Sequence, residues 1–149
     1  MAEQPAVGRD FEATIAQFQR AADEFAKGNS DPAKTLFSRR EDVMLANPFG
    51  PAVLGWDRVA AALDYAASRF SDGEVSGTER VVTYATDELA VIHEIEHWKA
   101  RVGSGEVTPF DLRVTSTLRR EDGVWKFVHR HADPISKADT QGPLRNVNA

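Results

Sequence analysis

Cysteine is absent from this 149-residue sequence, which excludes disulfides, thiolate nucleophiles and cysteine metal ligands. Long apolar runs are absent too: no stretch approaches the roughly 20 residues that span a bilayer, and MAEQPAVGRD is no signal peptide. We therefore expect a cytoplasmic protein with no membrane contact. An excess of basic charge is also missing, because the net charge is -5 and the pairs Arg39-Arg40 and Arg119-Arg120 lie beside acids. Nucleic acid is therefore not an expected partner.

The composition indicates one globular domain. Hydrophobic residues make up 42% and charged residues 28% of the chain, which suffices for a substantial core. We place this domain at residues 10–135. Residues 1–9 are expected to be a flexible N-terminus. Residues 136–149 are expected to be a flexible tail, because the sequence after Asp133 is polar and shows no hydrophobic period.

The first half of the chain has helical periodicity. Apolar residues recur at three- and four-residue steps from Phe11 to Phe25 and predict an amphipathic helix that ends at Gly28. Asp31-Pro32 predicts the start of a short second helix running through Leu36 and Phe37. A third helix is expected after Gly55, with an inner side formed by Val59, Leu63, Ala66, Ala67 and Phe70.

The second half has the signals of strands. A short strand is expected at 42–46, followed by the turn NPFGP. After a break at 71–73, long segments rich in β-branched and aromatic residues begin at Val75. The turns that separate them are expected at 86–87, 103–105 and 122–123. This pattern predicts four long antiparallel strands.

The stretch HEIEHW, from His93 to Trp98, matches H-E-x-x-H, in which two histidines hold zinc and the glutamate activates water. A helix is compatible with the spacing of Val91, Ile95 and Trp98. A strand is favoured, because the stretch lies between strand-like runs with short turns on each side. On a strand, His93 and His97 would lie about 13 Å apart, too far to share one zinc ion. A zinc protease is therefore not expected.

Two segments carry a resemblance to a known family: NPFGPAVLGWDRV at 47–59 and LRVTSTLRREDGVWKFVHRHADP at 112–134. Over residues 10–135 the chain resembles SnoaL-like members of the NTF2-like superfamily, which includes ketosteroid isomerase. The resemblance implies an α+β fold, a cone of three N-terminal helices packed on a strongly curved, mostly antiparallel sheet. It also implies a ligand pocket inside the cone and a homodimer formed through the sheet.

The resemblance places Asn47 where ketosteroid isomerases carry their catalytic aspartate, before a Pro-x-Gly turn. An amide cannot accept a proton near neutral pH, so isomerisation by that route is not expected. Asn47 is expected either to donate a hydrogen bond to a ligand carbonyl or to support the turn at Pro48.

Strand register decides which other side chains face the pocket. With Asp122-Gly123 as a two-residue loop, Glu121 pairs with Val124. The inner-face pairs that follow are Leu118 with Phe127, Ser116 with His129 and Val114 with His131.

The preceding hairpin has two possible registers. If 103–105 is the whole loop, Glu94 and Glu96 face inward, and the cross-strand pairs are Trp98 with Phe110, His97 with Asp111 and Glu94 with Val114. If the loop is only 104–105, the glutamates face outward and Glu96 meets Arg113. We prefer the first register for its aromatic pair.

In the preferred register, Glu94 and His131 flank Val114 at a separation of about 10 Å. We expect Glu94 to be the catalytic base and His131 the acid or oxyanion partner, in an isomerase or lyase without a cofactor. The expected ligand is a small apolar molecule with a carbonyl group. The expected substrate-binding residues are Asn47, Phe49, Trp56, Glu96, Trp98, Phe127 and His129.

Other interpretations stay open. His129, His131 and a glutamate could in principle hold a metal ion, although spacing fixes no third ligand. Each histidine could be a core imidazole, and each glutamate could pair with an arginine. Trp125 is expected to anchor the core. The alternative function is a non-catalytic ligand-binding or dimerisation module.

Overall fold

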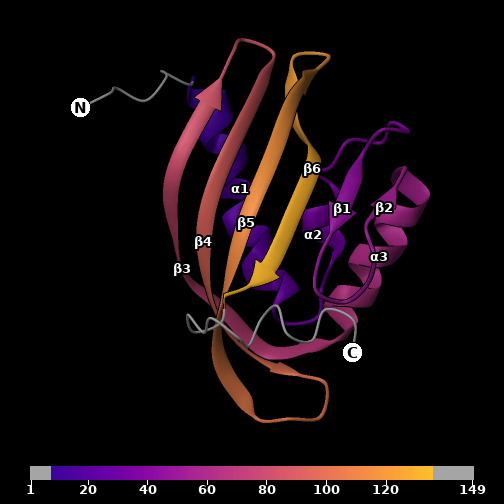
Figure 1. Ribbon diagram of the computed structural model, residues 1–149, viewed down its shortest axis with the longest axis vertical. Helices are drawn as coiled ribbons and strands as arrows, with labels where there is room; N and C mark the ends of the chain where they lie inside the picture. Colours follow the sequence, from indigo (N-terminus) through magenta and orange to yellow (C-terminus); the bar gives the residue numbers. More distant parts are fainter. Residues whose placement is uncertain (1–7, 136–149) are drawn as a thin grey trace, which may run out of the picture.

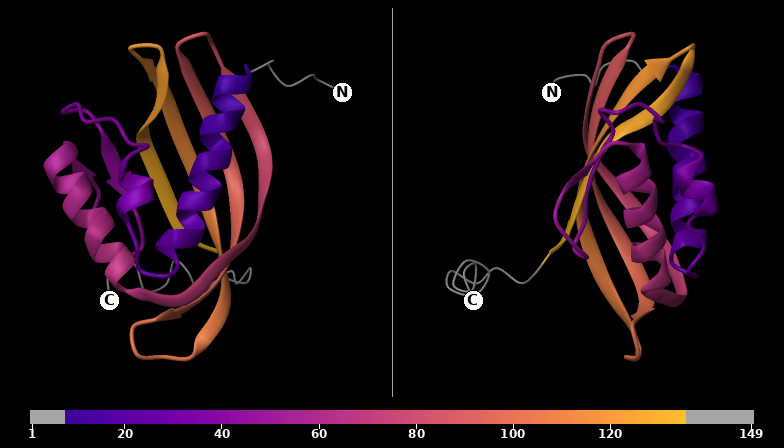
Figure 2. Two further views of the ribbon diagram at one scale, coloured as in Figure 1. Left: turned by 180° about the vertical axis from the view of Figure 1, so that it is seen from behind. Right: turned by 90° about the vertical axis from the view of Figure 1, so that its right-hand side faces the viewer.

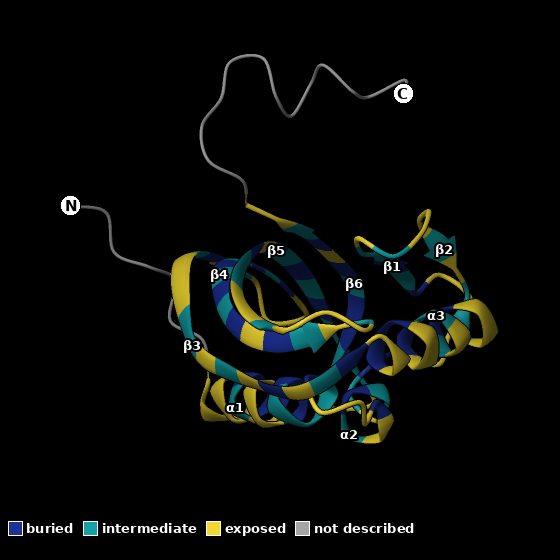
Figure 3. Ribbon diagram, turned by 90° about the horizontal axis from the view of Figure 1, so that it is seen from below, coloured by how far each residue is buried: buried dark blue, intermediate teal, exposed yellow. Residues whose placement is uncertain are grey.

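A computed structural model describes residues 8–135. Within them, three helices lie on one face of a curved sheet, and none of these helices covers the other face (Figures 1 and 2). Seen from below, α1 and α2 lie on one side of the long strands, along which buried and more exposed residues alternate (Figure 3). The predicted α+β cone is confirmed.

The helices are α1 (Arg9–Phe25), α2 (Asp31–Lys34) and α3 (Trp56–Ser68). The strands are β1 (Met44–Ala46), β2 (Val53–Leu54), β3 (Phe70–Ala85), β4 (Leu89–Val102), β5 (Val107–Glu121) and β6 (Val124–Pro134). They form one sheet in the order β2-β1-β6-β5-β4-β3. Only the β1–β6 pair is parallel, so the four long strands form the antiparallel meander that the sequence predicts.

Three predicted boundaries are wrong. The third helix ends at Ser68, so Phe70 belongs to β3 and not to the inner side of that helix. The second helix ends at Lys34, and Phe37 instead forms a bridge with Phe127 of β6. Residues 71–73 are not a break, because β3 already begins at Phe70 and passes through an irregularity in its pairing with β4. At Gly73 the strand passes so close to α1 that an added Cβ would lie 2.5 Å from the carbonyl oxygen of Ala26. Glycine therefore permits a bend where the sequence suggests a turn.

The preferred register of the β4/β5 hairpin is confirmed. Trp98 lies opposite Phe110 with ring centroids 5.8 Å apart, and Glu94 lies opposite Val114. Glu94 and Glu96 are therefore buried on the inner face of the sheet, with 6% and 3% of their surface exposed.

The predicted register of the β5/β6 hairpin is wrong beyond its first residues. Leu118 pairs with Phe127 as expected, but Thr117 pairs with His129, so Val128 is an extra residue in β6. Such a β-bulge reverses which face each later residue occupies. His129 and His131 therefore lie on the outer face, and Arg130 lies on the inner face.

The core fills the space between α1, α3 and the inner face of the sheet. Phe11, Ile15 and Phe18 of α1 are buried, which confirms the predicted apolar stripe. Trp125 is buried and meets Phe11 edge-on at 5.2 Å, so it is the expected core anchor. In the described part of the chain, no helix has the length and hydropathy needed to span a membrane. The predicted flexible ends lie outside the described residues, except for residues 8 and 9.

Candidate functional site

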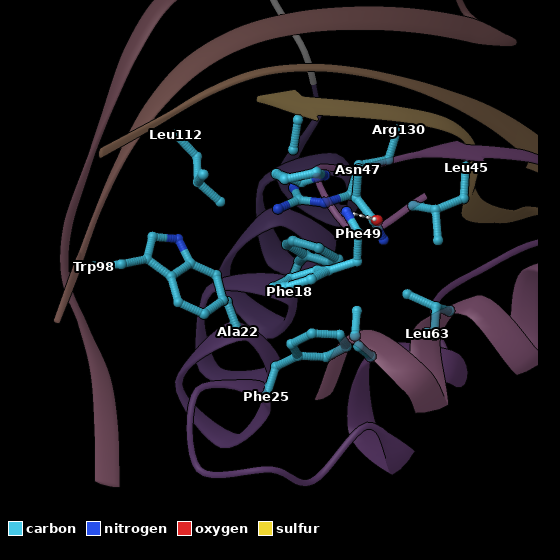
Figure 4. A pocket seen from close by; sticks show the side chains of 14 residues that line it. Phe18, Ala22, Phe25, Leu45, Asn47, Phe49, Leu63, Trp98, Leu112 and Arg130 are labelled. Carbon is cyan, nitrogen blue, oxygen red and sulfur yellow. Dashed lines mark hydrogen bonds between the residues drawn. The ribbon is translucent and has the colours of Figure 1, made fainter. Parts of the chain in front are cut away.

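A small cavity of about 50 Å³ lies inside the cone. It is lined by side chains from the three helices, from β1 and the turn after it, and from the inner face of β4, β5 and β6 (Figure 4). The lining residues are Phe18, Ala22, Phe25, Ala33, Leu45, Asn47, Pro48, Phe49, Leu63, Ala66, Trp98, Leu112, Arg130 and Ala132. Apart from Asn47 and Arg130, these residues have apolar side chains, if the mainly apolar indole ring of Trp98 is included. Three of the predicted substrate-binding residues, Asn47, Phe49 and Trp98, are thus brought together.

Arg130 is the charged residue of this lining and is only 8% exposed. Its two terminal nitrogens donate to the two carboxylate oxygens of Glu96 at 2.9 and 3.1 Å. The indole nitrogen of Trp98 donates to the same carboxylate at 3.0 Å. The guanidinium carbon also lies 4.9 Å from the ring centroid of Phe18. Glu96 thus orients Arg130 and Trp98, two residues that line the cavity, without lining it itself.

A guanidinium has five N–H donors, and the two bonds to Glu96 use two of them. The bonds to Glu96 therefore leave three N–H donors of Arg130, a residue of the cavity lining, unused. Arginine is well suited to such a position because its planar group pairs with one partner while it presents other donors.

Glu94 lies beside this pair but does not line the cavity. Its carboxylate lies 3.7 Å from Nε of Arg80, which also binds Glu12 of α1 at 2.6 Å. Burial raises the pKa of Glu94, and the neighbouring charge of Glu96 adds to this rise, while Arg80 and Arg130 partly oppose it. Glu94 is thus a buried carboxyl group with an increased tendency to hold a proton.

Asn47 has the structural role foreseen for it. Its side-chain oxygen accepts a hydrogen bond from the backbone N–H of Phe49 at 3.0 Å, which fixes the turn after β1. That bond leaves the two N–H donors of its amide for a ligand. Phe49 is half-buried and meets Phe70 edge-on at 5.4 Å.

Four predicted site residues lie elsewhere. Phe127 is in the core, 4.5 Å from the ring of Phe18 and only 1% exposed. Trp56 starts α3 and lies under the guanidinium of Arg39 at 3.8 Å, outside the cavity lining. His129 and His131 lie on the outer face because of the bulge in β6. Glu94 and His131 are therefore on opposite faces of the sheet, and the expected acid/base pair is not assembled.

All four histidines of the chain lie on the outer face of the sheet. The HEIEH stretch is part of β4, as predicted, and its two histidines have separate partners. His93 bonds to Thr115 at 2.8 Å and His97 to Asp111 at 2.7 Å. The hydrogen bond with Asp111 raises the pKa of His97.

The other two histidines lie on β6. His131 contacts Asp133 at 2.7 Å, and His129 contacts Thr117 at 3.0 Å. Burial lowers the pKa of His129, and the nearby His131 adds to this effect. Within residues 8–135, no three histidine or acidic side chains are grouped so that they could hold a metal ion. A site made of His129, His131 and an inner glutamate is excluded, because the sheet separates them.

Sequence reasoning missed Arg130 and most of the apolar lining. In sequence, Arg130 lies between two histidines that fit a binding site better. Its role depends on the extra residue in β6, for which the sequence has no turn residue or proline as a signal.

The fold and the site define a class of protein: a small α+β cone with an apolar pocket that contains one buried arginine. The family model for the SnoaL-like domain matches residues 12–135, so the chain belongs to the SnoaL-like domain family. No curated protein matches the sequence.

Solved structures share the fold at low sequence identity. An NTF2-like superfamily protein from Salmonella enterica serovar Typhimurium has a TM-score of 0.72 and 17% identity, with 90% of this chain and 94% of that chain covered. A ketosteroid isomerase-like protein from Erwinia carotovora atroseptica has a TM-score of 0.65 and 18% identity, with 85% and 92% covered. A protein with a cystatin-like fold from Nostoc punctiforme has a TM-score of 0.68 and 13% identity, with 91% and 97% covered. At these identities the likeness establishes the fold alone.

Proposed function

We propose that this protein binds a small, mainly apolar molecule whose carbonyl or hydroxyl oxygen accepts hydrogen bonds from Arg130. The observation that carries this proposal is the buried guanidinium of Arg130 in the lining of an otherwise apolar cavity. A few polar groups in an apolar pocket are typical of small-molecule sites, where they fix the orientation of the ligand.

The charges around the cavity favour a neutral ligand. The bidentate pair of Arg130 and Glu96 has no net charge. A carboxylate ligand would therefore add an uncompensated negative charge in a buried site, which is costly. A ketone or alcohol oxygen can accept from Arg130 and from the amide of Asn47 without that cost.

The experiment compares two ligands of the same shape. The ligands, which are titrated calorimetrically, are butanone and its methylene analogue, in which a CH₂ group replaces the carbonyl oxygen. The proteins are wild type, Arg130→Met and Arg20→Met. Arg20 is an exposed arginine on α1 that does not line the cavity, and it serves as the matched control. Wild type and Arg20→Met are expected to bind the ketone more tightly than the analogue, and Arg130→Met is expected to lose this preference. Equal binding of both ligands to wild type would contradict the proposal.

Catalysis on such a ligand is the second candidate. It requires the ligand to reach past the cavity lining to Glu94, a carboxyl group buried beside Arg130 and Glu96. Burial raises the pKa of Glu94, so this carboxyl group keeps its proton to a higher pH than a solvent-exposed one, which suits a general acid/base. Deuterium exchange from solvent into the α-carbon of a bound ketone, measured for wild type and Glu94→Gln, tests this role. Exchange at the same rate in both proteins would refute it.

We also propose that a second copy of the chain covers the outer face of the sheet. Val91 and Ile95 of β4 lie half-buried on that face, one on each side of His93, and no helix of residues 8–135 covers them. Sedimentation equilibrium is expected to find a dimer for wild type and for Tyr65→Lys, a control on α3, but a monomer for Ile95→Lys. A monomeric wild type would refute this assembly.

A further inference from the structure

A second cavity of about 110 Å³ adjoins the first one. It lies between β1, β2, the turn after β1 and α3, and three residues line both cavities: Leu45, Asn47 and Phe49. The remaining residues of its lining are Gly50, Pro51, Val53, Ala62 and Tyr65. The second cavity is about twice as large as the first.

Helix α3 continues from one cavity to the other. Leu63 and Ala66 line the first cavity, whereas Ala62 and Tyr65 line the second. Tyr65 is 55% exposed, so the second cavity reaches the surface of the protein. The two cavities thus lie one behind the other between Arg130 in the interior and solvent at α3, separated by the wall that they share.

Phe49 is the residue in the shared wall that can move. Leu45 is only 2% exposed and belongs to β1, which pairs with β2 and β6. Phe49 is half-buried on a turn, where its backbone is held by Asn47 and its ring touches Phe70 through one edge. A rotation of this side chain would join the cavities without changing a strand.

The size of the first cavity requires such an extension. At roughly 10–15 Å³ for each water, its volume of about 50 Å³ holds only a few solvent molecules. Typical small-molecule sites are several times larger. A ligand whose oxygen contacts Arg130 therefore has to continue past Phe49 if it contains more than a few carbons.

We propose that the second cavity is the outer half of one binding site, that Phe49 is its gate, and that the ligand is elongated. Its oxygen-bearing end contacts Arg130, and its apolar chain passes Phe49 and lies against α3. This inference rests on the proposed function above, because it assumes that the ligand starts at Arg130.

The test uses linear methyl ketones from butanone to nonanone and their methylene analogues. They are titrated into wild type, Phe49→Ala, Ala62→Phe and Ala61→Phe. Ala62→Phe fills the outer half, whereas Ala61 is exposed on the same helix and lines neither cavity, so Ala61→Phe is the matched control. Urea unfolding of each variant verifies that it is folded.

In wild type and Ala61→Phe, Kd is expected to fall about fourfold for each added methylene, as expected for a buried CH₂ group. In Ala62→Phe this improvement is expected to stop after the shortest ketones. Phe49→Ala is expected to keep it and to bind branched chains that wild type rejects. The same length dependence in Ala62→Phe and Ala61→Phe, or none in wild type, would overturn the inference.

The methylene analogues separate this inference from the proposed function. If ketones bind better than analogues but chain length has no effect, the role of Arg130 stands and the outer half is refuted. If analogues and ketones bind equally tightly at every chain length and both improve with length, the outer half stands and the oxygen contact with Arg130 is refuted. If neither series binds to wild type, both are refuted.

Discussion

The buried pair of Glu96 and Arg130 leads to a prediction about stability. Glu96→Gln keeps the size of the side chain and an oxygen for the indole N–H of Trp98, but leaves the guanidinium of Arg130 buried without a counter-charge. A guanidinium cannot lose its proton to escape this cost. Removing one partner of a buried pair costs about 3–5 kcal/mol, so we expect the free energy of unfolding of Glu96→Gln to fall by this amount.

Replacing both partners should cost less than this single change. In Glu96→Gln/Arg130→Met neither charge of the pair remains, and a partly bonded amide costs about 1–3 kcal/mol. Urea unfolding of wild type, both single variants and the double variant gives the coupling energy of the pair. The matched control is Glu24→Gln on α1, which removes an exposed ion pair with Lys27. This change should leave the stability nearly unchanged. Additive costs, or a cost of Glu96→Gln below about 1 kcal/mol, would refute this reasoning.

Three further predictions concern other parts of the molecule. Because the pKa of Glu94 is raised on folding, wild type should lose stability as pH rises from the ordinary carboxyl range through that raised value. Glu94→Gln should remove this loss, and urea unfolding between about pH 4 and 8 measures it. The hydrogen bond with Asp111 raises the pKa of His97, so Asp111→Asn should lower the pH at which the His97 ring titrates, as followed by NMR. An unchanged titration midpoint would contradict the contact between the two side chains. Gly73→Ala should destabilise the protein by about 1–3 kcal/mol, because the added Cβ would clash with the backbone carbonyl oxygen of Ala26. Thermal unfolding measures this loss, and an unchanged midpoint would contradict the close approach of the two segments.

The sequence predicts best the features that depend on local patterns. The helix from Phe11 to Phe25 follows from its apolar spacing, and the β4/β5 register follows from the match of Trp98 with Phe110. Both rest on residues whose preferences agree with the fold, so neighbouring sequence is sufficient.

The site was less predictable because it depends on contacts between distant segments. Arg130 and Glu96 are 34 residues apart and meet only when three strands are aligned. The inward direction of Arg130 depends on one unpaired residue, Val128, which has an ordinary strand preference. The cavity wall at Phe49 likewise forms only when the turn after β1 packs against α3.

The bulge at Val128 decides which side chains of β6 point to the inner face of the sheet and which point to the outer face. With the extra residue, the end of β6 presents a guanidinium to the pocket and imidazoles to the outer face; without it, the same residues would present the imidazoles to the pocket. Deletion of Val128 would therefore exchange a guanidinium for imidazole rings on the inner face of the sheet. In this fold, the register of β6 thus determines the side chains of the pocket and those of the outer surface together, so that a shift in register changes both.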